Sequence, residues 1–216
     1  MIDLPEMPWV IARLRRDKRG YPIPWFVAWI GGEPDFRVIE PGRLQKAVRQ
    51  NRCWICGGRL GRMKVFVIGP MCAINRISSE PPSHLHCADW AARACPFLTR
   101  PRMSRSPRPM PADAATAPGI MLERNPGVTL LWGTLRYRVK PASGPAGPGV
   151  LFDIGRPEII RWYAEGRAAT REEVGESIKG GFPNLLALAQ AEGLDAVDAL
   201  FEKLEDALPL LPKEAA

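Results

Sequence analysis

The chain has 216 residues and a formal net charge of +7, and 46% of its residues are hydrophobic. This length and composition suit one or two globular domains with apolar cores and argue against wholesale disorder. The first residues lack the basic flank and the apolar stretch of a signal peptide, and no apolar run approaches the roughly 20 residues that span a bilayer. We therefore expect a soluble, cytoplasmic protein without a membrane partner.

The charge is distributed unevenly along the chain. Residues 150–216 carry 13 acidic and 7 basic side chains, whereas the residues before them carry 10 acidic and 23 basic ones. A basic region favours a polyanionic partner, because Lys and Arg side chains that bind phosphates release condensed counterions. Nucleic acid is thus the partner that we expect first, and the alternative is solubility charge that serves no partner.

The first predicted elements are a β-hairpin and a short helix. Residues 23–30 and 35–39 are apolar stretches on either side of turn residues, which is typical of a hairpin. A helix is predicted over 41–50. Five basic side chains precede the hairpin and fit either a solvated turn or a contact with a phosphate backbone: Arg13, Arg15, Arg16, Lys18 and Arg19.

The cysteines point to metal ligation. There are five, an odd number, and four of them lie with both histidines between Cys53 and Cys87, which suits a metal site better than a disulfide framework. Cys53 and Cys56 form a Cys-x2-Cys turn followed by two glycines, as in a zinc knuckle. The glycines disfavour a redox pair, whose second cysteine should continue into a helix.

A second ligand pair is predicted at the start of a helix. After a strand at 65–68, two prolines and Ser83, a candidate N-cap, open a helix that ends near Pro96. His84 and Cys87 are three residues apart in its first turn and share a face. We predict a structural zinc ion bound by Cys53, Cys56, His84 and Cys87. Other open possibilities are an iron–sulfur cluster and a ligand place for Cys72, His86 or Cys95.

Two resemblances follow from these motifs. The order of knuckle, strand pair and helix start over residues 50–97 resembles treble-clef zinc fingers. The chain is also similar to uncharacterised proteins of actinobacterial phages and high-GC bacteria, which implies a phage or mobile-element context and no particular activity. The segments that carry this second resemblance are Cys53-x2-Cys56-Gly57, Phe66 to Cys72, Asn75-Arg76, Glu80-Pro-Pro, Cys87-Ala88 and Cys95 to Leu98.

The sequence offers no firm catalytic residue. His-Asn-His nucleases are often built on treble-clef frames, but the strand at 64–68 lacks the histidine that would activate water. Nucleoside deaminases place a His-x-Glu motif before a Cys-x2-Cys motif, an order that this chain does not have. A thiol nucleophile at Cys72, assisted by His84 or His86, remains an alternative. We therefore favour binding over catalysis and assign no catalytic residue.

A Pro/Arg-rich segment and a basic strand follow the finger. Residues 99–127 are predicted to form an extended linker or arm. Strands are predicted at 128–132 and 134–140, and alternation in the second puts three basic side chains on one face. We predict nucleic-acid contacts by the arm and this strand, against the alternatives of a covering strap and an ordinary sheet exterior; the residues are Arg100, Arg102, Arg105, Arg108, Arg136, Arg138 and Lys140.

The last third of the chain is predicted to be mainly helical. Thr170 and Glu173 form a capping box. A loop at 141–149 and a strand at 150–154 should precede helices over 157–165, 170–179, 184–192 and 195–208. Five apolar residues should line one face of the last helix and dock it on the core or form a homodimer seam: Leu194, Val197, Phe201, Leu204 and Leu208.

The sequence therefore predicts an α+β protein with three regions. Residues 1–98 form a basic α+β region that contains the treble-clef-like finger, 99–127 are the linker or arm, and 128–216 hold short strands followed by a small acidic helical region. The expected function is that of a nucleic-acid-associated phage or bacterial accessory protein. The rival expectation is a protein–protein adaptor or inhibitor of a host protein, acting through its acidic helices or through exposed aromatic residues such as Trp54.

Overall fold

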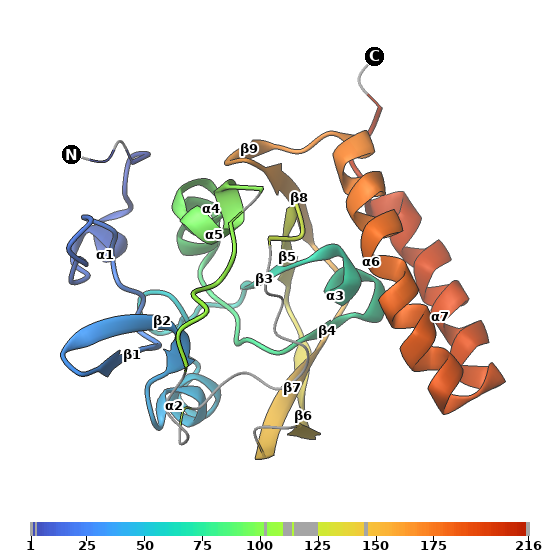
Figure 1. Cartoon of the computed structure of the whole chain (residues 1–216), viewed down its shortest axis with the longest axis horizontal. Coiled ribbons are helices and arrows are strands. Elements are labelled where there is room, and N and C mark those ends of the chain that lie inside the picture. Colours follow the sequence, from blue (N-terminus) through green and yellow to red (C-terminus); the bar gives the residue numbers. More distant parts are fainter. Residues whose placement is uncertain are drawn as a thin grey trace.

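The computed structural model of the chain describes residues 2, 4–101, 103–109, 114, 125–144 and 147–214, and it has a mixed α+β architecture (Figure 1). The helices are α1 (Trp9–Ala12), α2 (Arg43–Arg49), α3 (Pro70–Asn75), α4 (Leu85–Ala94), α5 (Pro96–Thr99), α6 (Arg171–Glu192) and α7 (Leu194–Ala207). The strands are β1 (Val27–Ile30), β2 (Glu33–Ile39), β3 (Lys64–Ile68), β4 (Ile77–Ser78), β5 (Thr129–Thr134), β6 (Tyr137–Gly144), β7 (Gly147–Ile154), β8 (Ile159–Ala164) and β9 (Arg167–Ala168).

The central sheet joins the two halves of the chain. It has the order β3-β5-β8-β9, and its paired strands run antiparallel. All six residues of β5 are buried between β3, from before the arm, and β8, from after it. A second sheet, β4-β7-β6, also pairs an early strand with later ones, whereas β1 and β2 form a separate hairpin. The regions before and after residues 99–127 therefore share both larger sheets.

The main core lies between these sheets and the helical pair α6–α7. Phe66, Trp132 and Phe152 are fully buried at its centre. Helix α6 contributes Val174 and α7 contributes Leu200. In Figure 1 this pair lies on the right, and α1, α2, α4 and the β1–β2 hairpin lie on the left. None of the helices in the described part of the chain is both long and apolar enough to cross a membrane.

A second, smaller core surrounds the cysteines of the predicted finger. Ile11 of α1 is completely buried there, against Cys53, Cys87 and Trp90. The Trp90 indole nitrogen also donates a hydrogen bond to the carbonyl oxygen of Pro5, at 3.2 Å. The N-terminal segment is therefore packed directly onto the region that should bind metal.

Several predicted elements are confirmed. The hairpin, the helix before Cys53, the strand after the knuckle and the strand at 128–132 correspond to β1–β2, α2, β3 and β5. The capping box is also present, since the Thr170 hydroxyl accepts from the Glu173 amide at 3.2 Å and the Glu173 carboxylate accepts from the Thr170 amide at 2.8 Å. Apolar periodicity and capping chemistry are local signals, which explains why these elements could be located.

Other elements differ from the prediction. The helix expected at 157–165 is wrong, because that segment is strand β8, whose β-branched and aromatic residues complete the central sheet beside β5. The loop expected at 141–149 is wrong for its described residues, because 141–144 belong to β6 and 147–149 to β7, while 145 and 146 lie outside the described residues. The two helices expected at 170–179 and 184–192 are one helix, α6, with Pro183 inside it. Pro183 is exposed, so the carbonyl group that loses its helical partner can bond to water.

The last helix is placed correctly, but its predicted apolar face is buried only in part, since Leu204 packs against the main core and Val197 is half-buried. Leu200 and Ala207 are its buried residues. Leu194 and Phe201 of α7 and Leu208 of the turn that follows it are 83%, 44% and 43% exposed at intervals of seven residues. Phe201 also contacts Phe182 of α6, with ring centres 5.7 Å apart. The buried face of α7 therefore coincides only in part with the predicted one.

Candidate metal centre

The knuckle is a tight turn held by backbone hydrogen bonds. The Gly57 amide donates to the Cys53 carbonyl at 2.8 Å, and the Cys53 amide donates to the Gly58 carbonyl at 2.7 Å. Gly57 has φ +72°, a conformation that favours glycine. A side chain there would also collide with Trp25, whose ring would lie 2.6 Å from an added Cβ. Two independent constraints therefore require glycine at this position: the positive φ of the backbone and the close packing of the Trp25 ring.

Strand β3 positions the second ligand pair. Val65 and Ser83 exchange two backbone hydrogen bonds, with the Ser83 amide 2.7 Å from the Val65 carbonyl and the Val65 amide 3.0 Å from the Ser83 carbonyl. The next residue, His84, is the N-cap of α4, and Cys87 lies in the first turn. Ser83 is therefore not the cap that the sequence suggested, because its backbone is held by β3. The consequence for the ligands is unchanged: His84 and Cys87 face the knuckle together.

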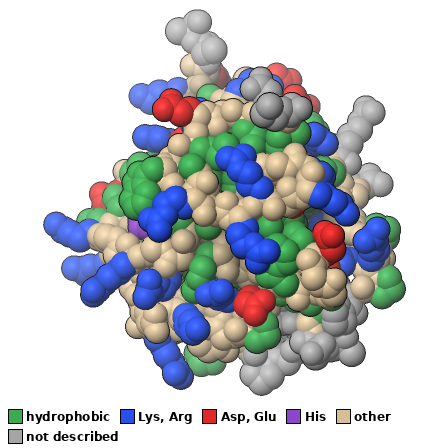
Figure 2. Space-filling view, turned by 90° about the vertical axis from the view of Figure 1, so that its left-hand side faces the viewer, with side chains coloured by type: hydrophobic (Ala, Val, Ile, Leu, Met, Phe, Trp, Pro, Cys, Tyr) green, Lys and Arg blue, Asp and Glu red, His purple; other side chains and the backbone are tan. Residues whose placement is uncertain are grey.

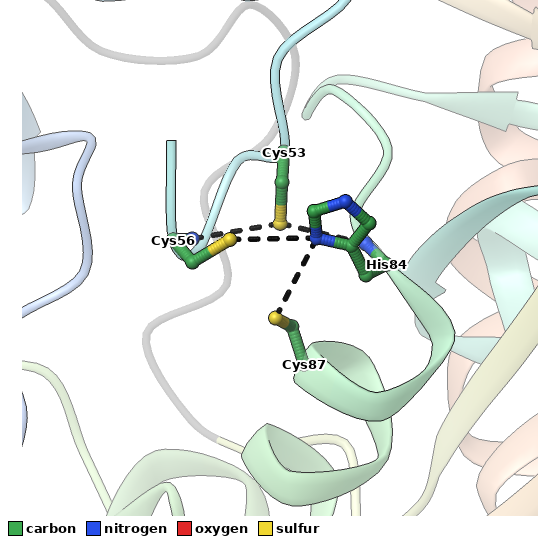
Figure 3. A group of neighbouring side chains, drawn as sticks. All are labelled: Cys53, Cys56, His84 and Cys87. Carbon is green, nitrogen blue, oxygen red and sulfur yellow. Dashed lines mark hydrogen bonds between the residues drawn. The ribbon is translucent and has the colours of Figure 1, made fainter. Parts of the chain in front are cut away.

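The four predicted ligands converge (Figure 3). Their ligand atoms all lie within 4.8 Å of one another. The Nδ1 atom of His84 is 3.4 Å from the Cys56 sulfur and 3.8 Å from the Cys87 sulfur. A tetrahedral ion with bonds of about 2.3 Å to sulfur and about 2.0 Å to nitrogen puts its ligand atoms about 3.5 to 3.8 Å apart. The group is close enough to hold a metal ion with only small adjustments.

Groups around the ligands orient them. The Cys53 sulfur accepts backbone N–H bonds from Cys56 at 3.5 Å and from His84 at 3.4 Å, which disperses thiolate charge. The Nε2 atom of His84 lies 3.0 Å from the carbonyl oxygen of Arg59. A proton on Nε2 makes this bond and leaves Nδ1, which faces the sulfurs, free to bind a metal. The imidazole is therefore held in the tautomer that a metal ligand needs.

The ligands also perturb one another's protonation in the metal-free protein. Hydrogen bonds from Cys56 and then Cys87 lower the pKa of Cys53, whereas hydrogen bonds to Cys53 and Cys56 raise the pKa of Cys87. Hydrogen bonding to Cys53 raises the pKa of His84 to about 10. Cys53 therefore holds its proton weakly, whereas Cys87 and His84 hold theirs tightly, and a metal ion that binds here has to displace those protons.

The residues left as alternative ligands do not join this group, among those that the structure describes. Cys72 lies in α3 and Cys95 follows the end of α4. Desolvation raises the pKa of the Cys72 thiol to about 11 and also raises that of Cys95, so neither thiol is an activated nucleophile. His86 is exposed and stacks on His84, with ring centres 5.0 Å apart.

The arm residues selected for nucleic-acid contact lie partly against the protein. Arg37 of β2 donates hydrogen bonds to the carbonyl oxygens of Ser106 and Arg108, at 2.8 and 2.6 Å, and so holds this part of the arm as a strap. The Arg105 guanidinium lies 4.5 Å from the centre of the Phe97 ring, and Arg100 is exposed. Arg102 lies outside the described residues.

The basic strand is partly neutralised by its neighbour. Arg138 and Lys140 both form ion pairs with Asp153 of β7, at 3.2 and 2.8 Å, because the register places Asp153 opposite Arg138. Lys140 is the main cause of the lowered pKa of Asp153. Arg136 is exposed but lies in the bend between β5 and β6, so it precedes the strand that carries the other two.

A different basic surface surrounds the knuckle, and of its residues only Arg13, Arg15 and Arg16 were candidates for a phosphate contact from the sequence. Figure 2 views the molecule from the side of the N-terminal elements, and Lys and Arg side chains are spread over this face with far fewer Asp and Glu. We call it the basic face. Its exposed members near the knuckle are Lys46, Arg49, Arg59 and Arg62, and those near α1 are Arg13, Arg15 and Arg16. Their closeness in sequence to Cys53 and Cys56 was the signal that could have identified the first group.

Comparison of the chain with protein-family models, with curated proteins and with solved structures gave no significant match.

Proposed function

We propose that the chain binds one structural zinc ion at Cys53, Cys56, His84 and Cys87 and uses the surrounding basic face to bind nucleic acid. In this proposal the ion performs no chemistry on a substrate. It fixes a knuckle and a helix start, and through them the surface that carries the arginine side chains. The phage or bacterial accessory role suggested by the sequence motifs would be one setting for such a protein.

The donor set supports zinc as the ion. Three thiolates and one imidazole suit Zn²⁺, and four protein ligands leave no open position for water or substrate, which is typical of structural sites. The sulfurs of Cys53 and Cys87 belong to completely buried residues, which also favours a structural role. The donor set fits an iron–sulfur cluster less well, because such clusters are normally bound by four cysteines and this group has three.

The local topology supports a treble-clef-like finger. A knuckle, a strand and a helix N-terminus supply the ligands in the order that this type of finger uses. The departure is at the strand: β3 pairs with β5 of the central sheet and meets the segment before α4 only at Ser83. We therefore propose a treble-clef variant in which the usual hairpin is reduced to one bridge and the finger is built into a larger sheet.

The observation that carries nucleic-acid binding is the excess of unpaired arginines on the basic face. Residues 4–62 contain twelve Lys and Arg but five Asp and Glu. Three of these acids already pair with basic residues of the same segment: Asp17 with Arg19, Asp35 with Arg37 and Glu33 with Lys18. Among the described residues, no carboxylate pairs with Arg13, Arg15, Arg16, Arg49, Arg52, Arg59 or Arg62.

The acidic helices lie on the other side of the molecule. Helices α6 and α7 are on the right of Figure 1, away from α1, α2 and the β1–β2 hairpin. A polyanion approaching this protein would be attracted to the basic face and repelled by the helices. The uneven charge along the sequence therefore becomes a difference between two sides of the molecule, which supports an oriented approach to phosphates.

Salt-dependent binding tests this proposal. We expect a labelled oligonucleotide to bind the purified protein with an affinity that falls steeply as salt rises, as measured by fluorescence anisotropy. The triple variant Arg49→Gln/Arg59→Gln/Arg62→Gln should bind more weakly and reduce the slope of log K against log salt by about 0.7 to 0.9 for each lost phosphate contact.

A matched control removes the same charge from the acidic side. Lys179→Gln/Lys203→Gln/Lys213→Gln should leave both affinity and slope nearly unchanged. A third variant, Arg136→Gln/Arg138→Gln/Lys140→Gln, measures the contribution of the basic strand. Binding that does not respond to salt, or that weakens equally in the first variant and in the acidic-side control, would remove the proposal.

A second candidate function has one specific observation in its favour. Leu194 and Phe201 of α7 and Leu208 of the turn after it are exposed and have the seven-residue spacing of a helical contact surface. This spacing favours a protein-binding role for the helical pair, with another chain or a second copy. Trp54 plays no part in this, because it is only 3% exposed and stacks on Phe26, contrary to the expectation from sequence. Sedimentation analysis of Leu194→Asp/Phe201→Asp against the unmodified protein would detect self-association through these two residues.

A further inference from the structure

We infer that the basic face binds single-stranded nucleic acid, with Trp9 and Trp29 as stacking surfaces for unpaired bases and Arg13 and Arg15 as their phosphate-binding neighbours. This inference rests on the proposed function and names its substrate class.

Trp9 is a large apolar side chain turned toward solvent. It is 68% exposed at the start of α1, although the same short helix buries Ile11 completely. The Arg13 guanidinium lies 5.4 Å from the centre of the Trp9 ring. With one arginine beside it and most of its surface open, the indole is available for contact with another flat group.

Trp29 repeats this arrangement on the β1–β2 hairpin. It is 36% exposed, and the Arg15 guanidinium lies 4.0 Å from the centre of its ring. Two other large apolar side chains of the hairpin, Ile30 and Phe36, are 40% and 36% exposed. The hairpin thus presents apolar surface beside an arginine that has no carboxylate partner among the described residues.

The arginines of the two Trp–Arg pairs are near neighbours in the chain. Arg13 and Arg15 are two residues apart, so their Cα atoms are separated by at most about 7 Å. Apolar side chains lie between Lys and Arg side chains on the face shown in Figure 2. Exposed aromatic rings with arginines beside them suit the nucleotides of one strand, whose bases stack while their phosphates meet the arginines.

This pattern favours a single strand over a duplex. In a duplex the flat faces of the bases are covered by their neighbours, so an exposed indole has nothing to stack on, whereas arginines bind the phosphates of both forms. Stacking is tolerant of base identity, because every base has a flat face. We therefore infer that the protein prefers single-stranded to double-stranded nucleic acid and has little preference for base sequence.

The core around the metal centre packs against the helix that carries Trp9. Ile11 of α1 is packed against Cys53 and Cys87, and Trp90 of α4 bonds to Pro5 at the start of the N-terminal segment. Loss of the ion should destabilise the small core around Cys53 and Cys87, against which α1 packs. Trp9 and Arg13 lie at the two ends of this helix. Single-strand binding is therefore expected to depend on the metal although no ligand residue touches the nucleic acid.

The test compares three probes with the full chain in its metal-loaded form: a single-stranded DNA of about 20 nucleotides, the RNA of the same sequence, and the DNA duplex. We expect the single strands to bind at least about tenfold more tightly than the duplex at one salt concentration. The DNA and RNA probes show which single strand is preferred. Trp9→Ala/Trp29→Ala should lose at least about tenfold on single strands with little change on duplex.

Two further variants keep the test decisive. Trp9→Leu/Trp29→Leu retains apolar volume without a ring and serves where alanine disturbs folding or metal content. Phe201→Ala removes an aromatic of similar exposure from α7 and should change nothing. Equal affinity for single strand and duplex, or full single-strand affinity in the leucine variant, overturns this inference but leaves the basic face as a nucleic-acid site. The absence of salt-dependent binding to any probe overturns both.

Discussion

The hydroxyl of Tyr163 on β8 donates a 2.5 Å hydrogen bond to the carboxylate of Asp89 on α4, and so ties the helix that carries His84 and Cys87 to the central sheet. Asp89 also pairs with Arg93 of the same helix and with Arg161 of β8. This contact joins residues 74 positions apart in the chain. The metal centre is therefore anchored to strands that the sequence places far beyond the finger.

Removing this hydroxyl should weaken the protein measurably. We expect Tyr163→Phe to lower the free energy of unfolding by about 1 to 2 kcal/mol, because a hydrogen bond to a charged group is lost and the carboxylate keeps a weaker set of partners. Tyr137→Phe is the control, since the Tyr137 hydroxyl makes no hydrogen bond with a described residue. Chemical denaturation of the two variants gives the comparison, and equal losses would contradict the anchoring role.

The same bond predicts a pH effect. Desolvation, followed by the hydrogen bond to Asp89 and its charge, raises the pKa of Tyr163. A raised folded-state pKa means that the stabilisation is complete below the usual tyrosine pKa of about 10 and is lost as pH rises through the folded value. The stability of Tyr163→Phe should fall less steeply above pH 10 than that of the unmodified protein. Parallel curves would show that Tyr163 does not titrate differently on folding.

Gly57 offers a test of the knuckle that leaves every ligand in place. Gly57→Ala should lower stability by at least about 2 kcal/mol, since the new side chain meets Trp25 and the backbone has a positive φ. Gly61→Ala is the matched control, because nothing lies within 4 Å of its added Cβ. Thermal unfolding and metal content should both be affected in the first variant alone. A fully stable Gly57→Ala protein would mean that the knuckle turn can relax.

The capping box at the start of α6 gives a prediction independent of the metal. Thr170→Ala should cost about 1 kcal/mol of stability. The Arg167 side chain, bonded to Glu173, lowers the pKa of Glu173 to about 2. The stabilisation by Glu173 is therefore present above its usual pKa near 4.5 and is lost as pH falls toward 2.

Glu173→Gln should accordingly make the stability of the protein less dependent on pH in that acidic range. Glu176→Gln is the control, because Glu176 is exposed one turn later and forms no ion pair with a described residue. Denaturation at several pH values would separate the two variants, and identical acid profiles would contradict the contribution of the Glu173 carboxylate and its pairing with Arg167.

The strap can be released from β2 by one substitution. Arg37→Ala removes both hydrogen bonds to the arm, so trypsin should cleave the Arg105–Ser106 bond several times faster than in the unmodified protein. Arg19→Ala breaks a similar local pair with Asp17 and does not touch the arm, so it should leave the cleavage rate unchanged. A cleavage rate that ignores Arg37 would show that other contacts hold the strap.

The ligand set could be predicted from sequence because its signals are local. Cys53 and Cys56 are two residues apart across a turn, and His84 and Cys87 are three apart at a helix start, so each pair is preorganised by its own segment. Only the distance between the cysteine pair and the His84–Cys87 pair depends on the rest of the fold. Ser83 was wrongly predicted as the N-cap of α4, because a serine just before a helix is typical of a cap. Its backbone is instead hydrogen-bonded to Val65 of β3, and the N-cap is His84.

The rest depended on pairings that no local pattern contains. The segment 159–164 forms a strand because β5 lies beside it, and its helix-like spacing of apolar residues does not reveal that neighbour. Arg138 and Lys140 of the basic strand share the single carboxylate of Asp153, which the β6–β7 register places beside them. Conversely, the basic face gathers arginines from several elements, and their proximity appears only in three dimensions.

Elemental analysis of the purified protein tests the central claim most directly. The account predicts one zinc ion per chain, lost in Cys87→Ser and retained in Cys72→Ser and Cys95→Ser. Structural zinc in small fingers contributes about 10 to 16 kcal/mol, so chelation should unfold at least the segment from Cys53 to Pro96. A metal-free protein with an unchanged thermal transition, or one that binds iron in place of zinc, would contradict the account.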